Sequence, residues 1–174
     1  MSKLTWDEYW MLMAKLASKR GTCCKRQVGA CLVRENHLIS TGYNGTVKGY
    51  PNCNEGGCYR CNHPEEFPSG KGYDVCVCAH AERNAIDIAA SMGVATKGST
   101  IYLIGFKSLP CRACAISIIQ AGVEEVCILD EKQETQAESL EHDLFDKCCI
   151  KVRRLTLRPQ VIELFDEIDR RLIF

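Results

Sequence analysis

The chain has 174 residues, a length at which a single domain with a substantial apolar core is expected. Its 22 lysine and arginine residues balance 22 aspartate and glutamate residues, so the composition argues against a broad nucleic-acid surface, which normally shows a basic excess. We predict no signal peptide, and no apolar run approaches membrane-spanning length. We therefore expect a cytoplasmic protein whose 13 cysteines are metal ligands and buried thiols, not disulfides.

The first predicted element is an amphipathic helix over residues 5–19, which opens on a capping box formed by Thr5 and Glu8. Two strands follow, over residues 27–33 and 37–43. The turn between them is short enough for an antiparallel hairpin, so a helix and a strand pair are expected at the start of the fold.

A long segment without clear periodicity, residues 44–75, comes next and is rich in Gly, Asn, Pro and Cys. A loop of this length inside a compact domain is usually functional, disordered or held together by a bound group. Its cysteines favour a metal as that group. We therefore predict one domain, residues 1–174, that carries a cysteine-rich metal-binding insertion at about residues 46–78.

The second half of the chain alternates between helices and strands. The predicted helices cover residues 80–92, 111–121, 134–147 and 159–172, and the predicted strands cover residues 100–104, 126–129 and 150–157. Helices that alternate with strands after an initial hairpin are typical of an α/β sandwich. The pattern therefore predicts an α/β fold with a mixed five-stranded sheet.

Two short motifs stand where predicted helices begin. The first is His80-Ala81-Glu82, and the second is Pro110-Cys111-Arg112-Ala113-Cys114. One imidazole and two thiolates occupy three positions of a tetrahedral zinc, and the fourth position stays open, as in catalytic sites. The carboxylate of Glu82 is then not a ligand and is free to transfer protons. This H-x-E…P-C-x-x-C signature is that of the zinc-dependent nucleobase deaminases.

Each motif has a simpler interpretation when it is taken alone. A lone histidine in an apolar run is usually a packed core residue, and a lone Cys-x-x-Cys pair is more often a structural zinc site or a redox pair. A redox pair at Cys111 and Cys114 leaves His80 and Glu82 without a role, so together the two motifs favour the deaminase-type site. The partial positive charge at a helix N-terminus also favours the thiolate form of Cys111.

The chain resembles the deoxycytidylate (dCMP) deaminases of the cytidine deaminase superfamily over roughly residues 4–157. The matching stretches are Trp6-Asp7-Glu8-Tyr9-Trp10, Gln27-Val28-Gly29-Ala30, Gly42-Tyr43-Asn44-Gly45, His80 to Ile86, Pro110 to Cys114 and Ile119-Gln120-Ala121-Gly122. The cysteine-rich insertion looks most similar to phage and bacterial members. The resemblance implies the three-layer α/β/α cytidine deaminase-like sandwich.

The resemblance also implies an activity, the hydrolytic deamination of dCMP to dUMP and ammonia, which supplies the precursor of thymidylate. His80, Cys111 and Cys114 would hold a catalytic Zn²⁺ that lowers the pKa of its bound water toward about 7. Glu82 would take the proton of that water, pass it to ring N3 and later protonate the departing amine.

The family pattern implies further contacts with the nucleotide. The backbone N–H of Ala81 would donate to pyrimidine O2, Ala30 would line the same pocket, and Asn44 would bind the sugar hydroxyl. Asn44-Gly45 is also a common turn dipeptide, so a purely structural role for Asn44 stays open. The candidates for the phosphate are Lys25, Arg26 and Arg112, of which we favour Arg26, although all three also fit ordinary solvated cations.

The cysteines of the insertion predict a second, structural Zn²⁺. Cys58-x-x-Cys61 and Cys76-x-Cys78 have chelating spacing, and His63 is nearby. In some relatives a structural zinc joins the region before the first strand, this loop and the residue two before the catalytic histidine. The corresponding candidates are Cys23, Cys53, Cys58, Cys61 and Cys78, of which four would bind the ion, and the surplus of thiols leaves the ligand set open. The remaining Cys31, Cys127, Cys148 and Cys149 are predicted to be buried.

Members of the dCMP branch are typically hexamers that dCTP activates and dTTP inhibits, with the effector near the Gly-Tyr-Asn-Gly element. The resemblance therefore implies a homo-oligomer with an allosteric nucleotide site at Tyr43, Gly45 and Lys48, where Mg²⁺ accompanies the nucleotide. The insertion begins right after Lys48, which leaves open whether the regulation is retained. Apolar residues on more than one face of the helix over residues 111–121 agree with subunit packing.

Other functions compete with this one. A deaminase of adenosine in tRNA would favour basic helices, whereas the last predicted helix carries Asp166, Glu167 and Asp169. A deaminase of another cytosine nucleotide or of a free nucleoside shares the zinc motif, but free-cytidine enzymes typically have cysteine where His80 stands. A non-catalytic zinc module for protein contacts agrees with the cysteine-rich segment but leaves Glu82 without a purpose.

Overall fold

The structure, a computed structural model, describes residues 3–68, 71–105, 109–130 and 136–172, with the backbone alone over residues 136–141. At its centre is a five-stranded sheet with the order β2-β1-β5-β6-β7. The strands are β1 (Gly29–Arg34), β2 (His37–Tyr43), β5 (Thr100–Ile104), β6 (Glu125–Leu129) and β7 (Lys151–Leu155). β1 is antiparallel to β2 and β5, whereas β5, β6 and β7 are parallel, which confirms the predicted mixed sheet.

A two-residue turn joins β1 to β2. Glu35 and Asn36 both adopt positive φ, 51° and 57°, as the central residues of a type I′ hairpin turn require. This turn sets the antiparallel register of the two strands. β1 begins at Gly29 and not at residue 27 as predicted, because the N–H of Val28 donates to the side chain of Asn44 at 2.8 Å and not to a neighbouring strand.

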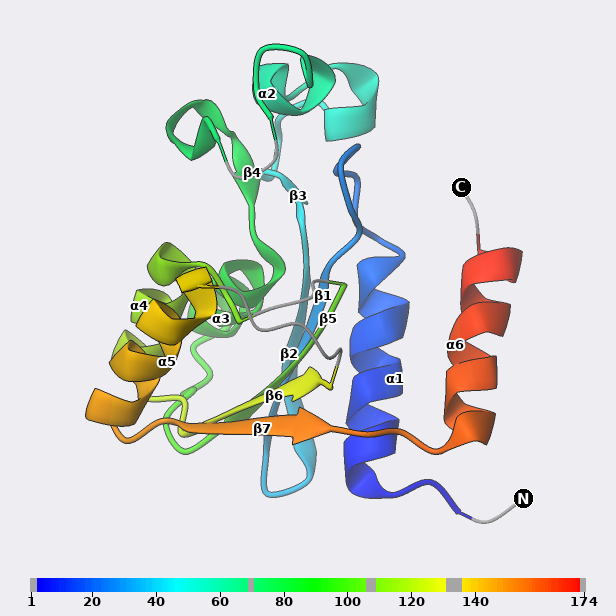
Figure 1. Ribbon diagram of the computed structural model, residues 1–174, viewed down its shortest axis with the longest axis vertical. Helices are drawn as coiled ribbons and strands as arrows, with labels where there is room; N and C mark the ends of the chain where they lie inside the picture. Colours follow the sequence, from blue (N-terminus) through cyan, green and yellow to red (C-terminus); the bar gives the residue numbers. More distant parts are fainter. Residues whose placement is uncertain (1–2, 69–70, 106–108, 131–135, 173–174) are drawn as a thin grey trace.

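Helices cover both faces of the sheet, so the fold has three layers (Figure 1). α1 (Trp6–Ser18) and α6 (Pro159–Arg171) lie on one face, and α3 (Ala81–Ser91), α4 (Arg112–Gln120) and α5 (Gln136–Lys147) lie on the other. This arrangement confirms the predicted α/β/α sandwich. The helix predicted over residues 134–147 corresponds to α5, and its first two positions lie outside the described residues. Within the described ranges, no helix combines the length and the apolar character needed to cross a membrane.

Apolar side chains that point alternately to the two faces of each strand form a core on each side of the sheet. In β1, Ala30 and Leu32 pack on the side of α3, while Cys31 and Val33 pack on the side of α1. Successive side chains of a strand point to opposite faces, so a strand buried on both sides is apolar throughout. The sheet is thereby held between its two helical layers.

One buried carboxylate joins the first helix to the last. The predicted capping box of α1 is present: the hydroxyl of Thr5 accepts from the N–H of Glu8, and the Glu8 carboxylate accepts from the N–H of Thr5 at 2.8 Å. The same carboxylate accepts two hydrogen bonds of 2.6 Å from Arg158, the N-cap of α6. The Arg158 guanidinium, helped by Thr5, lowers the pKa of Glu8 to about 2.

The cysteine-rich segment forms a small unit beyond one end of the sheet (Figure 1). Its two ends meet in a ribbon in which β3 (Gly45–Thr46) pairs with β4 (Cys78–Ala79). Between these strands lie the short helices η1 (Cys53–Glu55), α2 (Tyr59–Asn62) and η2 (Tyr73–Val75). The buried centre of the unit consists of Cys53, Cys58 and Cys61, so thiols take the place of an apolar core.

Four cysteines outside this unit were predicted to be buried. Cys31 and Cys127 are buried in the sheet, which confirms the prediction for them. For Cys148 and Cys149 the prediction is wrong, since both are exposed. They lie in the turn between α5 and β7, where Cys149 adopts a φ of 56° and its side chain faces solvent.

Candidate active site and metal centres

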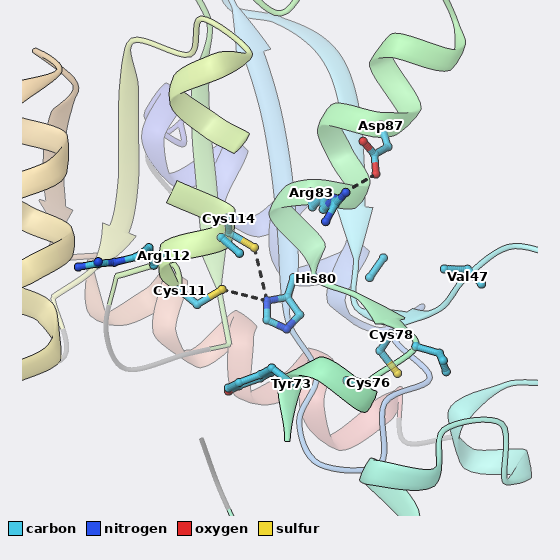
Figure 2. Close-up of a pocket in the computed structure, with 13 residues that line it drawn as sticks. Val47, Tyr73, Cys76, Cys78, His80, Arg83, Asp87, Cys111, Arg112 and Cys114 are labelled. Carbon is cyan, nitrogen blue, oxygen red and sulfur yellow. Dashed lines mark hydrogen bonds and ion pairs between the residues drawn. The ribbon is translucent and has the colours of Figure 1, made fainter. Parts of the chain in front are cut away.

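Two helices begin side by side and supply the predicted ligands of the catalytic metal (Figure 2). His80 is the N-cap of α3 and Cys111 is the N-cap of α4, while Cys114 lies in the first turn of α4. Nδ1 of His80 is 3.5 Å from Sγ of Cys111 and 3.4 Å from Sγ of Cys114. The structure therefore brings together the three side chains that the two motifs predicted.

These separations fit a zinc ion. A nitrogen about 2.05 Å and a sulfur about 2.3 Å from a tetrahedral zinc lie about 3.6 Å apart. Each of the three side chains offers one ligand atom, and these atoms all lie within 4.8 Å of one another. His80, Cys111 and Cys114 therefore have the donor types and the spacing for one Zn²⁺ with a fourth position left over.

Glu82 lies in the first turn of α3, two residues after His80, and only 3% of it is exposed. Burial raises the pKa of its carboxyl above the ordinary value, although its own backbone N–H and the nearby His80 oppose the shift. Its side chain also hydrogen-bonds with Cys114. The carboxyl is thus next to the ligands without being one of them, as a proton carrier requires.

The pKa values of the two thiols of the site are shifted in opposite directions. A hydrogen bond from Cys114, together with His80, lowers the pKa of Cys111 to about 4. The Cys111 thiolate and burial raise the pKa of Cys114, and the same thiolate raises the pKa of His80. Because ligands bind metals in their deprotonated form, binding of Zn²⁺ here would displace the proton of Cys114.

A pocket of about 600 Å³ opens beside the three ligands. Its walls come from the first turns of α3 and α4 and from the cysteine-rich segment. Tyr73, in η2, lies edge-on to the His80 ring with 5.7 Å between ring centroids. The guanidinium of Arg60 stacks on Tyr73 at 4.3 Å, which restrains the tyrosine ring beside the metal ligands.

Five residues that line the pocket were not singled out from the sequence: Val47, Tyr73, Val77, Arg83 and Asp87. Arg83 and Asp87 form an exposed ion pair of 3.8 Å on α3. Arg83 directly follows the His-x-Glu motif and Asp87 comes four residues after Arg83, a spacing from which the sequence could have predicted this ion pair. Tyr73 comes from the irregular segment, where no periodicity indicates it. Arg112 also lines the pocket, but its side chain points away from His80 (Figure 2).

The other substrate candidates are not among the residues that line the pocket. Ala30 and Ala81 are fully buried, in β1 and in the first turn of α3. The side-chain amide of Asn44 accepts from the N–H of Val28 and donates to the carbonyl of Arg26, both at 2.8 Å. The side chain of Arg26 is exposed and is not among the pocket walls.

Asn44 connects this region to the metal ligands. By its two hydrogen bonds it ties the chain before β1 to the start of β3. In the small ribbon, Gly45 then pairs with Ala79, the residue that precedes His80. The structural role that the sequence left open for Asn44 is therefore present. Asn44 and the pairing of Gly45 with Ala79 together connect the backbone of Arg26 to that of His80.

The second group of predicted metal ligands also comes together. The ligand atoms of Cys53, Cys58, Cys61 and Cys78 lie within 4.8 Å of one another. The fifth candidate, Cys23, has its Sγ 3.8 Å from that of Cys61. All five candidates therefore belong to one cluster of thiols.

The predicted effector residues lie at the edge of this unit. Gly45 is buried in β3, and Lys48 is exposed beyond it. The carbonyl of Tyr43 accepts a hydrogen bond of 2.9 Å from the side chain of Asn84, which lies on α3 two residues after Glu82. The Gly-Tyr-Asn-Gly element thus contacts the helix that carries the site.

Comparison with known proteins identifies the family. The model of the cytidine and deoxycytidylate deaminase zinc-binding region matches residues 4–130, which include both motifs. The chain belongs to this family. The cysteine cluster also lies within the matched part of this deaminase-family chain.

Individual relatives agree with this assignment. The deoxycytidylate deaminase of Schizosaccharomyces pombe is 47% identical over 122 residues, which are 70% of this chain and 36% of that protein. The deoxycytidylate deaminase of Mus musculus is 36% identical over 174 residues, which cover 97% of this chain and 90% of that protein. The chain thus spans 36% of the length of the fungal relative but most of the length of the mouse relative.

A solved structure agrees with the fold. The dCMP deaminase from the cyanophage S-TIM5, in complex with dCMP and dUMP, matches with a TM-score of 0.65 and 25% sequence identity. The match covers 89% of this chain and 100% of that chain. The cytidine deaminase-like fold expected from the sequence is confirmed.

Proposed function

We propose that this protein deaminates dCMP: water adds at C4 of the cytosine ring, and dUMP and ammonia leave. The observation that carries the proposal is the convergence of His80, Cys111 and Cys114 beside a pocket, with the buried carboxylate of Glu82 next to them. The deoxycytidylate deaminases among its relatives support the choice of substrate. The product dUMP is the substrate from which thymidylate is made.

His80, Cys111 and Cys114 would hold Zn²⁺, which when bound makes a water available as a nucleophile near neutral pH. Glu82 moves the protons. It accepts the proton that the attacking water releases, donates a proton to ring N3, and supplies a proton to the amine that leaves as ammonia. Because only 3% of Glu82 is exposed, bulk water does not compete with the carboxyl as the proton carrier.

We propose further contacts to the nucleotide. The N–H of Ala81 is at the first position of α3, where no intrahelical acceptor exists, so it is available for pyrimidine O2. The buried Ala30 would pack near the base. The two hydrogen bonds of the Asn44 amide leave one N–H and one oxygen lone pair for a sugar hydroxyl. The exposed guanidinium of Arg26 suits the phosphate, since it matches phosphate geometry with two parallel hydrogen bonds.

The same resemblance supports allosteric control by dCTP with Mg²⁺ as activator and by dTTP as inhibitor. Tyr43, Gly45 and Lys48 would bind the effector. The hydrogen bond from Asn84 to the Tyr43 carbonyl supports this proposal because it connects the effector element to the catalytic helix. A dCMP saturation curve that responds to neither nucleotide would contradict it.

We also propose a homo-oligomer, a hexamer as in the dCMP branch. In α4, Ala115 and Ile118 are fully buried against the sheet, whereas Ile116 is 47% exposed. The hexamers of the dCMP branch support this proposal, and the exposed Ile116 is compatible with a subunit contact at α4. Light scattering that returns a monomer would contradict the proposal.

Two further properties complete the proposal. The cysteine cluster would hold structural zinc in addition to the catalytic ion, through at least Cys53, Cys58, Cys61 and Cys78. The protein would work in the cytoplasm without nucleic-acid or membrane partners. All thirteen cysteines are free thiols, which supports a reducing compartment.

Ammonia release by the zinc-loaded protein tests the function against its alternatives. We expect turnover of dCMP and much weaker turnover of deoxycytidine, dCTP and an RNA hairpin that presents adenosine. Preference for dCTP or deoxycytidine would reassign the substrate within the cytosine class. Turnover of the RNA hairpin alone would make the protein a tRNA-type deaminase, and no turnover of any of the four would favour a non-catalytic zinc module.

A further inference from the structure

The cysteine-rich segment holds more thiols than one zinc ion uses. A quartet, formed by Cys53, Cys58, Cys61 and Cys78, already offers the four sulfurs of a structural site. Two more thiols, those of Cys23 and Cys76, lie against this quartet. A site for a single ion would leave both of them without a function.

The extra thiols are placed as ligands. Sγ of Cys23 lies 3.8 Å from Sγ of Cys61 and also hydrogen-bonds with Cys78. Sγ of Cys76 lies 3.8 Å from Sγ of Cys58 and likewise hydrogen-bonds with Cys78. Two sulfurs about 2.3 Å from one tetrahedral zinc lie about 3.8 Å apart. Both separations fit sulfurs that share an ion, and each of these two thiols also contacts a second member of the quartet, Cys78.

We propose that these six thiols hold two zinc ions in a thiolate-bridged cluster. One ion is bound by Cys23, Cys53, Cys61 and Cys78, and the other is bound by Cys58, Cys61, Cys76 and Cys78. Two four-coordinate ions need eight ligand positions, so six thiolates fill them when two of the sulfurs bridge.

Cys61 and Cys78 are the bridges because each contacts ligands of both ions. Cys61 contacts Cys23, which belongs to the first ion, and Cys58, which belongs to the second. Cys78 contacts Cys23 and Cys76, again one from each group. The sulfurs of Cys58, Cys61 and Cys78 also lie within 4.8 Å of one another, as three ligands of one ion must.

The surroundings of the cluster are those of an anion. Arg60 is only 5% exposed and donates a hydrogen bond to the sulfur of Cys61, with Cys76 close to its charge. No described carboxylate pairs with Arg60, whose Nε donates to the carbonyl of Lys71 at 2.7 Å. A buried guanidinium needs an anionic partner. Thiolates on both ions provide it.

Two neighbours of the cluster fall outside it. Cys24 is exposed. Its sulfur lies 3.7 Å from that of Cys53 and 3.9 Å from the side-chain oxygen of Asn62, and it contacts none of the other five thiols. His63 has its Nδ1 2.9 Å from the carbonyl of Tyr59, which occupies that nitrogen. Cys24 therefore provides a matched control, a cysteine beside the cluster that is not a ligand.

Zinc content separates the two-ion cluster from a single structural site. Elemental analysis of the zinc-loaded protein should give three zinc ions per chain, one catalytic and two in the cluster. His80→Ala, which removes the catalytic ion, should retain two. X-ray absorption at the zinc edge of that variant should show sulfur ligands and a second zinc as a near neighbour. Two zinc ions in the wild type, one in His80→Ala, or iron in place of zinc would overturn the proposal.

Serine variants test the ligand set. Cys23→Ser and Cys76→Ser should each lower the zinc content from three to two per chain, because each removes a terminal ligand of one ion. Cys24→Ser should retain three. If the quartet alone bound metal, Cys23→Ser and Cys76→Ser would keep the zinc content of the wild type, and that result would also overturn the proposal. The wild-type measurement stands even if a variant does not fold, and zinc content does not depend on deaminase activity.

Discussion

Replacing Glu82 by glutamine removes the proposed proton carrier while it keeps the size and shape of the side chain. Glutamine cannot ionise, so it neither accepts the proton of the attacking water nor returns one to the leaving amine. The fold should be unaffected, because the substitution keeps the volume at a position that is 3% exposed. Zinc content should also be unchanged, since Glu82 is not one of the three ligands.

The size of the effect follows from the position of the carboxyl. General acid–base catalysis by one side chain contributes about 10²–10⁴-fold to a rate. Because Glu82 is buried, bulk water cannot replace it as the proton carrier, and the same carboxyl serves several proton transfers. The decrease in kcat should therefore lie at the upper end of that range. A fall in kcat of about 10⁴ corresponds to about 5.5 kcal/mol in activation free energy.

The assay measures ammonia release from dCMP together with zinc per chain and the melting temperature. Asp143→Asn is a control, because Asp143 is an acidic helical residue with a side chain that is 56% exposed and is not among the pocket walls. It should leave kcat unchanged. A Glu82→Gln protein that retains zinc and turns over within tenfold of the wild-type rate would refute the proton-transfer role. Loss of zinc would instead show that the carboxyl holds the metal.

Three further predictions concern substrate binding, stability and the metal. Arg26→Gln should raise KM for dCMP at least about tenfold and leave KM for deoxycytidine unchanged, since it removes a charged hydrogen bond to phosphate. Arg170→Gln is its control, because Arg170 is exposed on α6 and is not among the pocket walls. Equal effects of Arg26→Gln on both substrates would exclude a phosphate contact. Glu8→Gln should lower the free energy of unfolding at pH 7 by about 1.5–3 kcal/mol, because Glu8 accepts two hydrogen bonds from Arg158. The pKa of Glu8 is about 2 in the folded state against an ordinary 4.5, so its contribution is full above pH 4.5 and is lost as the pH falls toward 2. Urea titrations should therefore show a smaller difference between wild type and variant at pH 3 than at pH 7, and a constant difference would contradict this. Removal of zinc by a chelator should abolish ammonia release, and added Zn²⁺ should restore it; activity that survives complete removal would exclude the proposed site.

The sequence alone identified what depends on local spacing. The three proposed ligands of the catalytic zinc and Glu82 are each within a few residues of a helix start, and a helix holds residues at such spacing in one arrangement whatever surrounds it. The alternation of strands and helices likewise predicted a mixed sheet between helical layers. The capping box of Thr5 and Glu8 could be predicted for the same reason, because its two residues are three positions apart at a helix start.

The tertiary structure decided what depends on contacts between distant segments. It alone showed that Asn44 ties the chain before β1 to the start of β3, and that Tyr73 reaches from an irregular segment to the ring of His80. It also showed which thiols meet in the cysteine-rich unit, because contacting pairs such as Cys23 and Cys61 are 38 residues apart in the sequence. No periodicity encodes such meetings. The ribbon of β3 and β4 brings the two ends of the segment together, whereas Cys23 reaches the cluster from the chain before β1.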